Sequence, residues 1–279
     1  MKHCHISILC NELTFLKQKL PFLYNNFEQV IFIDYDILNK CNSNDGSIEY
    51  IENFNDIDNK ITLVKFNEND LKTITNYNGT SMIEKRKMFA KGSQYIKNDI
   101  DIVWATDMDE FFDKKLLNVV ENEFTKDKDL ITLNVPHYIF IYNQYNIFKG
   151  NEINNTSYIC PPRITRHFKN KIYGHCNFHE YGKTIRCGNE FIYHFAWIGL
   201  KRIGFKLNIY YIKGKNDEMK KINNDTFLKQ YQENLEQKKK YINISHPNKL
   251  VNYNSIIFEG LIPNYIDAET LINELNEIN

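Results

Sequence analysis

Two acidic residues stand one position apart directly after an apolar stretch. Residues 103–112 read VWATDMDEFF, in which Asp107 and Asp109 follow the apolar part. In extended backbone, residues two apart point the same way, so these two carboxylates can face one point beyond the end of a strand. Carboxylates this close repel each other, and Mg²⁺ or Mn²⁺, which bind hard oxygen ligands, would remove that penalty. The motif predicts a metal site that can hold a diphosphate, with a solvated acidic turn as the alternative.

Two later clusters combine histidine with aromatic residues. Residues 174–182 read GHCNFHEYG, and residues 191–197 read FIYHFAW. Alternation predicts that Tyr193, Phe195 and Trp197 share one face of a strand, with His194 on the other face. Trp197 can stack on a sugar ring, but we favour a place in the core. A zinc site is a further alternative, although the spacing fits no standard zinc module. Its members would be His175, Cys176, His179 and Cys187.

Basic residues offer weaker signals. Arg163 and Arg166 can bind planar oxyanions such as donor phosphates or an acidic acceptor sugar, and surface ion pairing is the alternative that we favour. The run Lys238–Lys240 is expected to be a solvated helix face. Weak contact with a membrane surface is its alternative.

The elements that would position these residues alternate along the first half of the chain. The expected strands are His5–Leu9, Gln29–Ile33, Ile61–Phe66 and Ile100–Ala105, and the expected helices are Glu12–Tyr24, capped by Asn11, and Met82–Ile96. Strands separated by such helices are typical of parallel βαβ units. Ligands of open α/β sheets bind at the carboxyl ends of the strands, which is where Asp34 and Asp107 stand.

The second half of the chain is less regular. We expect β-structure over Leu130–Tyr142, Arg163–Phe168 and parts of Ile172–Gly199, and helices over Phe227–Tyr241 and Ile266–Ile278. We therefore expect one catalytic domain over residues 1–215, with a nucleotide-sugar half (1–115) and an acceptor half (116–215). Residues 216–279 are expected to form a helical C-terminal extension.

The order of these motifs resembles that of GT-A fold glycosyltransferases, near the family 2 and family 17 types. The matching pieces are Ile6–Cys10, Asp34, the basic run Glu84–Lys87 with Ala90 and Gly92, and DMDE at residues 107–110. The resemblance covers about residues 4–115 and is loose beyond residue 130. It implies a Rossmann-like α/β sandwich with a helical tail. It also implies transfer of a sugar, expected to be a hexose, from a nucleotide sugar to a glycan or protein acceptor.

The resemblance also implies cofactors and donor-binding residues. The donor would be a UDP-sugar first or a GDP-sugar second, held with Mn²⁺ or Mg²⁺. Asp34, with Asp36 beside it, would contact the base or ribose, and Cys10 and Asn11 would line the same site. The alternative for Asp34 is that it only caps the next turn. Arg86 would lie near the nucleotide or its phosphates, although Lys87 follows it where the family often has Asn.

The remaining implied roles concern the metal and the acceptor. Asp107 and Asp109 would bind the metal, and His194 matches a downstream histidine that often supplies a third ligand; a structural histidine is its alternative. Glu180 would be the general base of an inverting enzyme, which deprotonates the acceptor hydroxyl. The family's Glu-Asp pair is incomplete here, because Tyr181 follows Glu180. Asp109 and Glu110 are the fallback bases.

Composition limits the classes of function. Lys plus Arg and Asp plus Glu each number 35, so the net charge is zero, which argues against nucleic acid or an anionic membrane as the main partner. No apolar run approaches the roughly 18 residues that span a bilayer. The six cysteines include no C-x-x-C pair, and we expect them to be reduced in a cytoplasmic protein of a bacterium or, for a virus, of its host. The oligomeric state is not readable.

Three other functions remain open at this point. In a haloacid-dehalogenase-like phosphatase, Asp34 would be the nucleophile and Asp36 the acid–base residue, with Asp107 and Asp109 on Mg²⁺. Against it, Leu38 stands where Thr or Val is usual. A non-catalytic carbohydrate-binding protein would suit the aromatic content of 14%. A nucleotidyltransferase is disfavoured, because the first fifty residues hold no glycine-rich phosphate loop.

Overall fold

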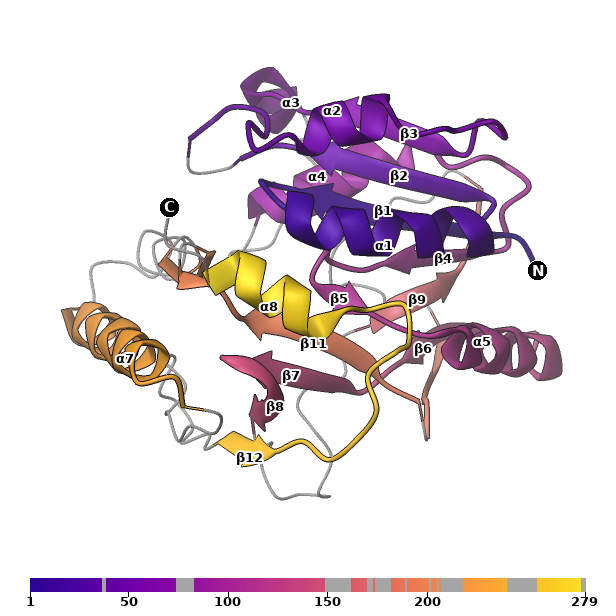
Figure 1. The fold of residues 1–279 in the computed structure, drawn as a ribbon. Coiled ribbons are helices and arrows are strands. Elements are labelled where there is room, and N and C mark those ends of the chain that lie inside the picture. Colours follow the sequence, from indigo (N-terminus) through magenta and orange to yellow (C-terminus); the bar gives the residue numbers. More distant parts are fainter. Residues whose placement is uncertain are drawn as a thin grey trace. The chain divides into compact units, whose positions relative to one another are not determined.

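The chain folds as two compact units, each built from two stretches of sequence (Figure 1). Unit 1 comprises Met1–Val135 and Cys160–Phe191, and unit 2 comprises Pro136–Ile159 and Ile192–Asn279. A computed structural model describes residues 1–36, 39–73, 83–148, 162–169, 173, 182–188, 190–200, 202–204, 206, 218–239 and 255–276. The functional boundaries expected near residues 115 and 215 stay a prediction.

Unit 1 contains a mixed sheet whose central part is parallel. Among the described residues its strand order is β10-β6-β9-β4-β1-β2-β3. The parallel strands are β1 (His3–Leu9), β2 (Gln29–Asp34), β3 (Ile61–Lys65) and β4 (Ile102–Ala105). Next to β4, β9 (Pro162–Arg166) is antiparallel to both β4 and β6 (Leu130–Asn134), and β10 (Lys183–Arg186) is parallel to β6. The α/β class that the sequence predicted is confirmed.

Helices connect these strands. They are α1 (Leu13–Asn26), α2 (Ser47–Glu52), α3 (Glu68–Thr73), α4 (Ile83–Ser93) and α5 (Lys114–Lys126). We did not expect α5, although its signal is plain: Asp113 caps it by accepting a hydrogen bond from the Leu116 amide at 3.1 Å.

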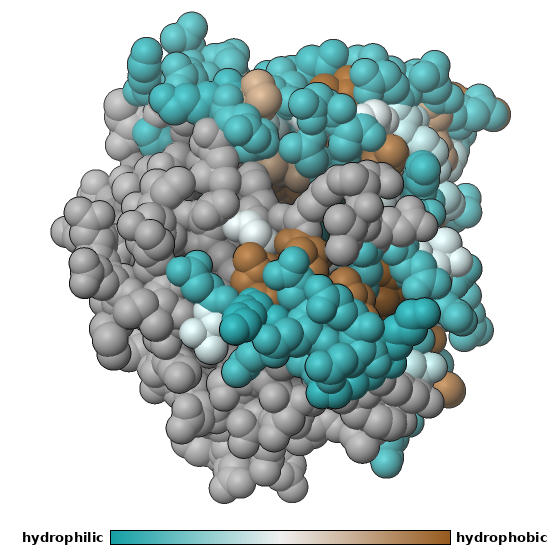
Figure 2. All heavy atoms as spheres, turned by 60° about the vertical axis from the view of Figure 1, so that its left-hand side comes forward, coloured by the Kyte–Doolittle hydropathy of each residue, from teal (hydrophilic) through white to brown (hydrophobic). Residues whose placement is uncertain are grey.

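Hydrophilic side chains cover the upper part of the face in Figure 2, around α2 and α3.

The core of unit 1 fills the space between α4 and the parallel strands. Ile6 and Ile31 are fully buried, and nearly every residue of β1 and β2 is buried, as expected of central parallel strands. Gly92 allows α4 to pack closely on this sheet, because a Cβ atom there would lie 2.6 Å from Ile33 Cδ1. The glycine in the predicted motif therefore has a packing reason.

One predicted helix cap is wrong. Asn11 does not cap α1: the N-cap position is Glu12, which makes no side-chain capping bond. Asn11 instead adopts a left-handed backbone with φ 54°. The first amide of the helix, that of Leu13, donates to Asp45 Oδ2 at 2.9 Å. The start of α1 is thus fixed by the loop after β2.

Unit 2 has a sheet and core of its own. Its strands are β7 (His137–Ile141), β8 (Asn143–Phe148), β11 (Ile192–Trp197) and β12 (Ser255–Ile257), in the order β12-β8-β7-β11. Its long helices are α7 (Glu218–Glu236) and α8 (Ala268–Asn276). Trp197 is buried and its ring lies 5.6 Å from that of Phe227, which confirms its expected place in the core. The stretch expected to be a helical extension also contains β12.

No helix in the described part of the chain has the length and apolarity needed to cross a membrane.

Candidate functional site

The sheet of unit 1 has a topological switch point between β1 and β4. The chain moves from β1 to β2 and β3 on one side, and β4 then pairs with β1 on the other side. In open α/β sheets, the loops at such a point diverge and leave a ligand-binding crevice at the carboxyl ends of the strands. Here those loops begin with Cys10 and Asn11 after β1, and with Thr106 and Asp107 after β4. The predicted metal motif therefore follows one of the two strands that flank the switch point.

The acidic motif forms a turn, so the extended geometry expected for it is wrong. The Glu110 amide donates to the Asp107 carbonyl at 3.1 Å, and the Asp107 amide donates to Glu110 Oε2 at 3.0 Å. The short strand β5 (Glu110–Phe111) follows. The two predicted metal ligands differ in access, because the Asp107 side chain is 17% exposed whereas Asp109 is buried. Asp107 is the carboxylate of the pair that faces solvent.

Two basic side chains contact the turn. Lys85, on α4, donates to Asp107 Oδ2 at 2.7 Å. Arg163, on β9, lies 3.4 Å from the same oxygen and forms a closer ion pair with Glu110 Oε1. Arg163 is buried, so the surface ion pairing that we expected for it is wrong. Lys85 is the neighbour of Arg86, the residue of α4 that the sequence predicts to lie near the donor phosphates.

A buried lysine forms hydrogen bonds with the residues at the start of the turn. Lys19, on α1, donates to the Asp107 carbonyl at 2.6 Å and to Thr106 Oγ1 at 3.1 Å. Burial lowers the pKa of Lys19 to about 8, against the nearby charges of Glu110, Asp109 and Asp107, which raise it. The place of Lys19 at this turn was not predicted. Its signal is that Lys19 falls on the apolar stripe of α1, one turn from Leu16 and Leu23.

Uncharged partners hold the aspartates after β2. Asp34 is fully buried, and its two carboxylate oxygens accept hydrogen bonds from the amide and hydroxyl of Ser43. Burial raises the pKa of Asp34, and the bonds from Ser43 oppose that rise. Asp36 accepts from Asn11 Nδ2 at 3.2 Å and from Asn39 Nδ2 at 2.7 Å. Asp34 is therefore fixed inside the loop, a poor arrangement for the nucleophile of a phosphatase.

Other predicted residues are distributed as follows. Cys10 is half-buried at the end of β1, and Arg86 is half-buried on α4. Arg166 donates to the carbonyls of Phe124 and Asp127 at 2.9 and 3.2 Å, so it stabilises the end of α5. The predicted base Glu180 lies outside the described residues, as do His175, Cys176 and His179 of the possible zinc site.

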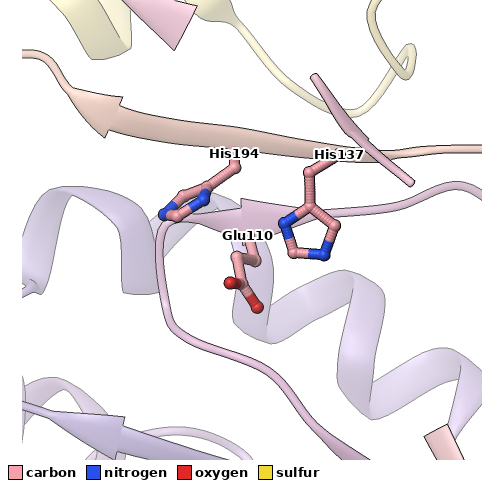
Figure 3. Close-up of side chains that lie close together, drawn as sticks. All are labelled: Glu110, His137 and His194. Atoms are coloured by element: carbon pink, nitrogen blue, oxygen red, sulfur yellow. The ribbon is translucent and has the colours of Figure 1, made fainter. Parts of the chain in front are cut away.

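In unit 2, two histidines lie next to each other on paired strands. The imidazoles of His137 on β7 and His194 on β11 have centroids 5.7 Å apart and meet edge to face. Figure 3 shows both rings as they project from their strands. His137 is buried, and sequence analysis did not single it out. The role of His194 as a third metal ligand stays a prediction.

Comparison with known proteins gives weak structural matches only. No family model and no curated protein matches the chain. The match to a crystal structure of S. aureus TarS 1–349 covers 86% of this chain and 73% of the TarS chain, with 12% identity and a TM-score of 0.44. A structure of the galactosyltransferase LgtC with donor and acceptor sugar analogues covers 47% of each chain, with 13% identity and a TM-score of 0.29.

Proposed function

We propose that this protein transfers a sugar from a nucleotide-sugar donor to a carbohydrate or protein acceptor, with a divalent cation at Asp107. The position of Asp107 carries the proposal. It is a partly exposed carboxylate at the end of β4, beside the switch point of a parallel sheet. Basic side chains lie beside it, and the partly exposed Lys85 among them can change partners, which suits a site that receives a diphosphate and releases it again.

The donor set of the turn suits a hard divalent cation. Asp107, Asp109 and Glu110 offer carboxylate oxygens, the ligand type that Mg²⁺ and Mn²⁺ favour. Asp107 is the accessible ligand, and Glu110 is occupied by its ion pair with Arg163. When bound, the cation would neutralise charge on the departing nucleoside diphosphate. Asp107 and Asp109 would hold it, as the family resemblance implies.

The basic residues around the turn have separate tasks in this proposal. Arg163 holds the Glu110 carboxylate in place through their ion pair, and Lys19 fixes the main chain at Asp107. Lys85, at the edge of the site, can meet the negative charge of the donor. The nucleoside would contact the loops after β1 and β2, where Cys10 and Asn11 stand near the loop that Asp34 and Asp36 brace. Glu180 remains the proposed base.

A thermal-shift screen tests this function. Wild type is heated with UDP-, GDP-, CMP- and dTDP-sugars, with and without Mn²⁺. A ligand at about 100 times its Kd stabilises the folded state by about 2.7 kcal/mol. We expect one nucleotide class to stabilise the wild type only with Mn²⁺, and Asp107→Asn to abolish the effect. The control Asp129→Asn, at an exposed position of unit 1, should behave as wild type. Ligand binding that Asp107→Asn leaves intact would favour a non-catalytic carbohydrate-binding protein.

A further inference from the structure

The oxygen that a cation needs at Asp107 already has a cationic partner. Lys85 Nζ lies 2.7 Å from Asp107 Oδ2, and Arg163 Nη2 lies 3.4 Å from that atom. Three carboxylates of the turn face three basic side chains, since Lys19 adds its charge to the other two. A divalent cation would add positive charge to this cluster, in which the three basic side chains already balance the three carboxylates.

The three basic residues are not equally fixed. Lys19 is fully buried and donates to two oxygen atoms of the β4 end. Arg163 is also buried, and moving it away would leave the buried Glu110 carboxylate without its ion-pair partner. The Lys85 side chain is 18% exposed. An ammonium on a flexible four-carbon stem at such a position can move into solvent at small cost.

We propose that Lys85 is a displaceable counterion of Asp107. It holds Oδ2, competes with a divalent cation for that oxygen, and turns to the donor diphosphate once the cation has taken its place. The inference rests on the proposed function and adds a regulatory contact to the same site. Its chemical result is coupling: the cation binds weakly alone and tightly with a nucleoside diphosphate, because the displaced ammonium then has a new anionic partner.

Lys91 offers a matched control on the same helix. It is also a lysine of α4 in an ion pair with an aspartate, since Lys91 Nζ lies 3.1 Å from Asp70 Oδ1. Its partner belongs to α3 and not to the acidic turn. Lys91→Met therefore removes the same charge from the same helix while leaving the contact at Asp107.

The test measures Mn²⁺ binding to the full-length chain by calorimetry at fixed pH and salt. We expect Lys85→Met to lower the Kd for Mn²⁺ by about tenfold, and Lys91→Met to leave it unchanged. Lys85→Gln is a second variant, in case the methionine disturbs folding. The affinity for UDP, measured at saturating Mn²⁺, should change in the opposite direction and fall in both Lys85 variants. General damage to the site would instead lower the affinity for both Mn²⁺ and UDP.

Equal Mn²⁺ affinity in wild type, Lys85→Met and Lys85→Gln would overturn the inference. If the wild type still bound a nucleotide sugar with Mn²⁺, the proposed function would survive that result. Failure of every variant to bind Mn²⁺ would also overturn the inference. The nucleotide-sugar screen on the wild type would then decide separately whether the transferase proposal stands.

Discussion

Two aspartate pairs of the same spacing end two strands of one sheet, yet they are held by different chemistry. Asp34 ends β2 and Asp36 follows it, and both accept hydrogen bonds from uncharged serine or asparagine groups. Asp107, after β4, meets Lys85 and Arg163. A carboxylate satisfied by fixed neutral donors braces a loop. A carboxylate whose partners include a movable charge, as Lys85 is for Asp107, can exchange that charge for a ligand, so the partner type separates a structural D-x-D from a candidate site.

The largest effect is expected from breaking the buried ion pair at the second site. Arg163→Met should lower the free energy of unfolding by about 3–5 kcal/mol, because the Glu110 carboxylate would remain buried without its main partner. Urea denaturation measures this change. The double variant Arg163→Met with Glu110→Leu should recover part of the loss. A single variant as stable as the wild type would show that Arg163 does not compensate the charge of Glu110.

The second largest effect is expected on activity, which should depend on the pair at Asp107 more than on the pair at Asp34. Asp107→Asn is expected to lower sugar transfer by about a hundredfold or more while leaving the unfolding midpoint nearly unchanged, because it removes the accessible carboxylate. Product formation from the donor identified by the ligand screen measures the rate. Asp129→Asn is the control. Full activity of Asp107→Asn would remove this residue from the reaction.

A smaller effect is expected at Asp34 and Asp36, the pair with uncharged hydrogen-bond donors. It should appear mainly as a loss of stability. Asp34→Asn should cost about 1–3 kcal/mol, because an amide NH₂ would face the two donors of Ser43. Relief of the buried charge offsets part of that cost. Thermal and urea unfolding would detect the loss, and donor affinity should fall with it. Asp34→Asn with wild-type stability but no donor binding would instead assign Asp34 to direct ligand contact.

The smallest effect is a dependence of stability on pH in the alkaline range, which is expected at the charged site. The pKa of Lys19 is about 8 in the folded protein and ordinarily 10.5. Between these values the unfolded chain binds more protons, so the contribution of Lys19 to stability is constant below pH 8 and increases up to pH 10.5. The wild type should therefore gain about 1 kcal/mol per pH unit over Lys19→Met in this window. If the unfolding free energies of the two proteins changed equally with pH in this window, the burial of a charged Lys19 would be contradicted.

The sequence predicts the scaffold better than the site. Strands β1 to β4 were found because buried parallel strands are continuous apolar runs, and their order along the chain implies βαβ units. The acidic motif was predicted from its spacing and from the apolar run before it. Its contacts with Lys19, Lys85 and Arg163 were not predicted, because these residues come from α1, α4 and β9, and only the folded chain brings them to Asp107. The turn was missed because extended backbone was assumed past the end of β4.

The place of β9 in the sheet affects how the protein is made. β9 pairs with both β4 and β6, although its residues follow theirs in the chain. During synthesis, the free edges of β4 and β6 cannot be closed until Arg166 has left the ribosome. Unpaired strand edges are templates for wrong pairing between chains. A nascent chain stalled between residues 135 and 161 therefore exposes edges of β4 and β6 that β9 covers in the folded protein.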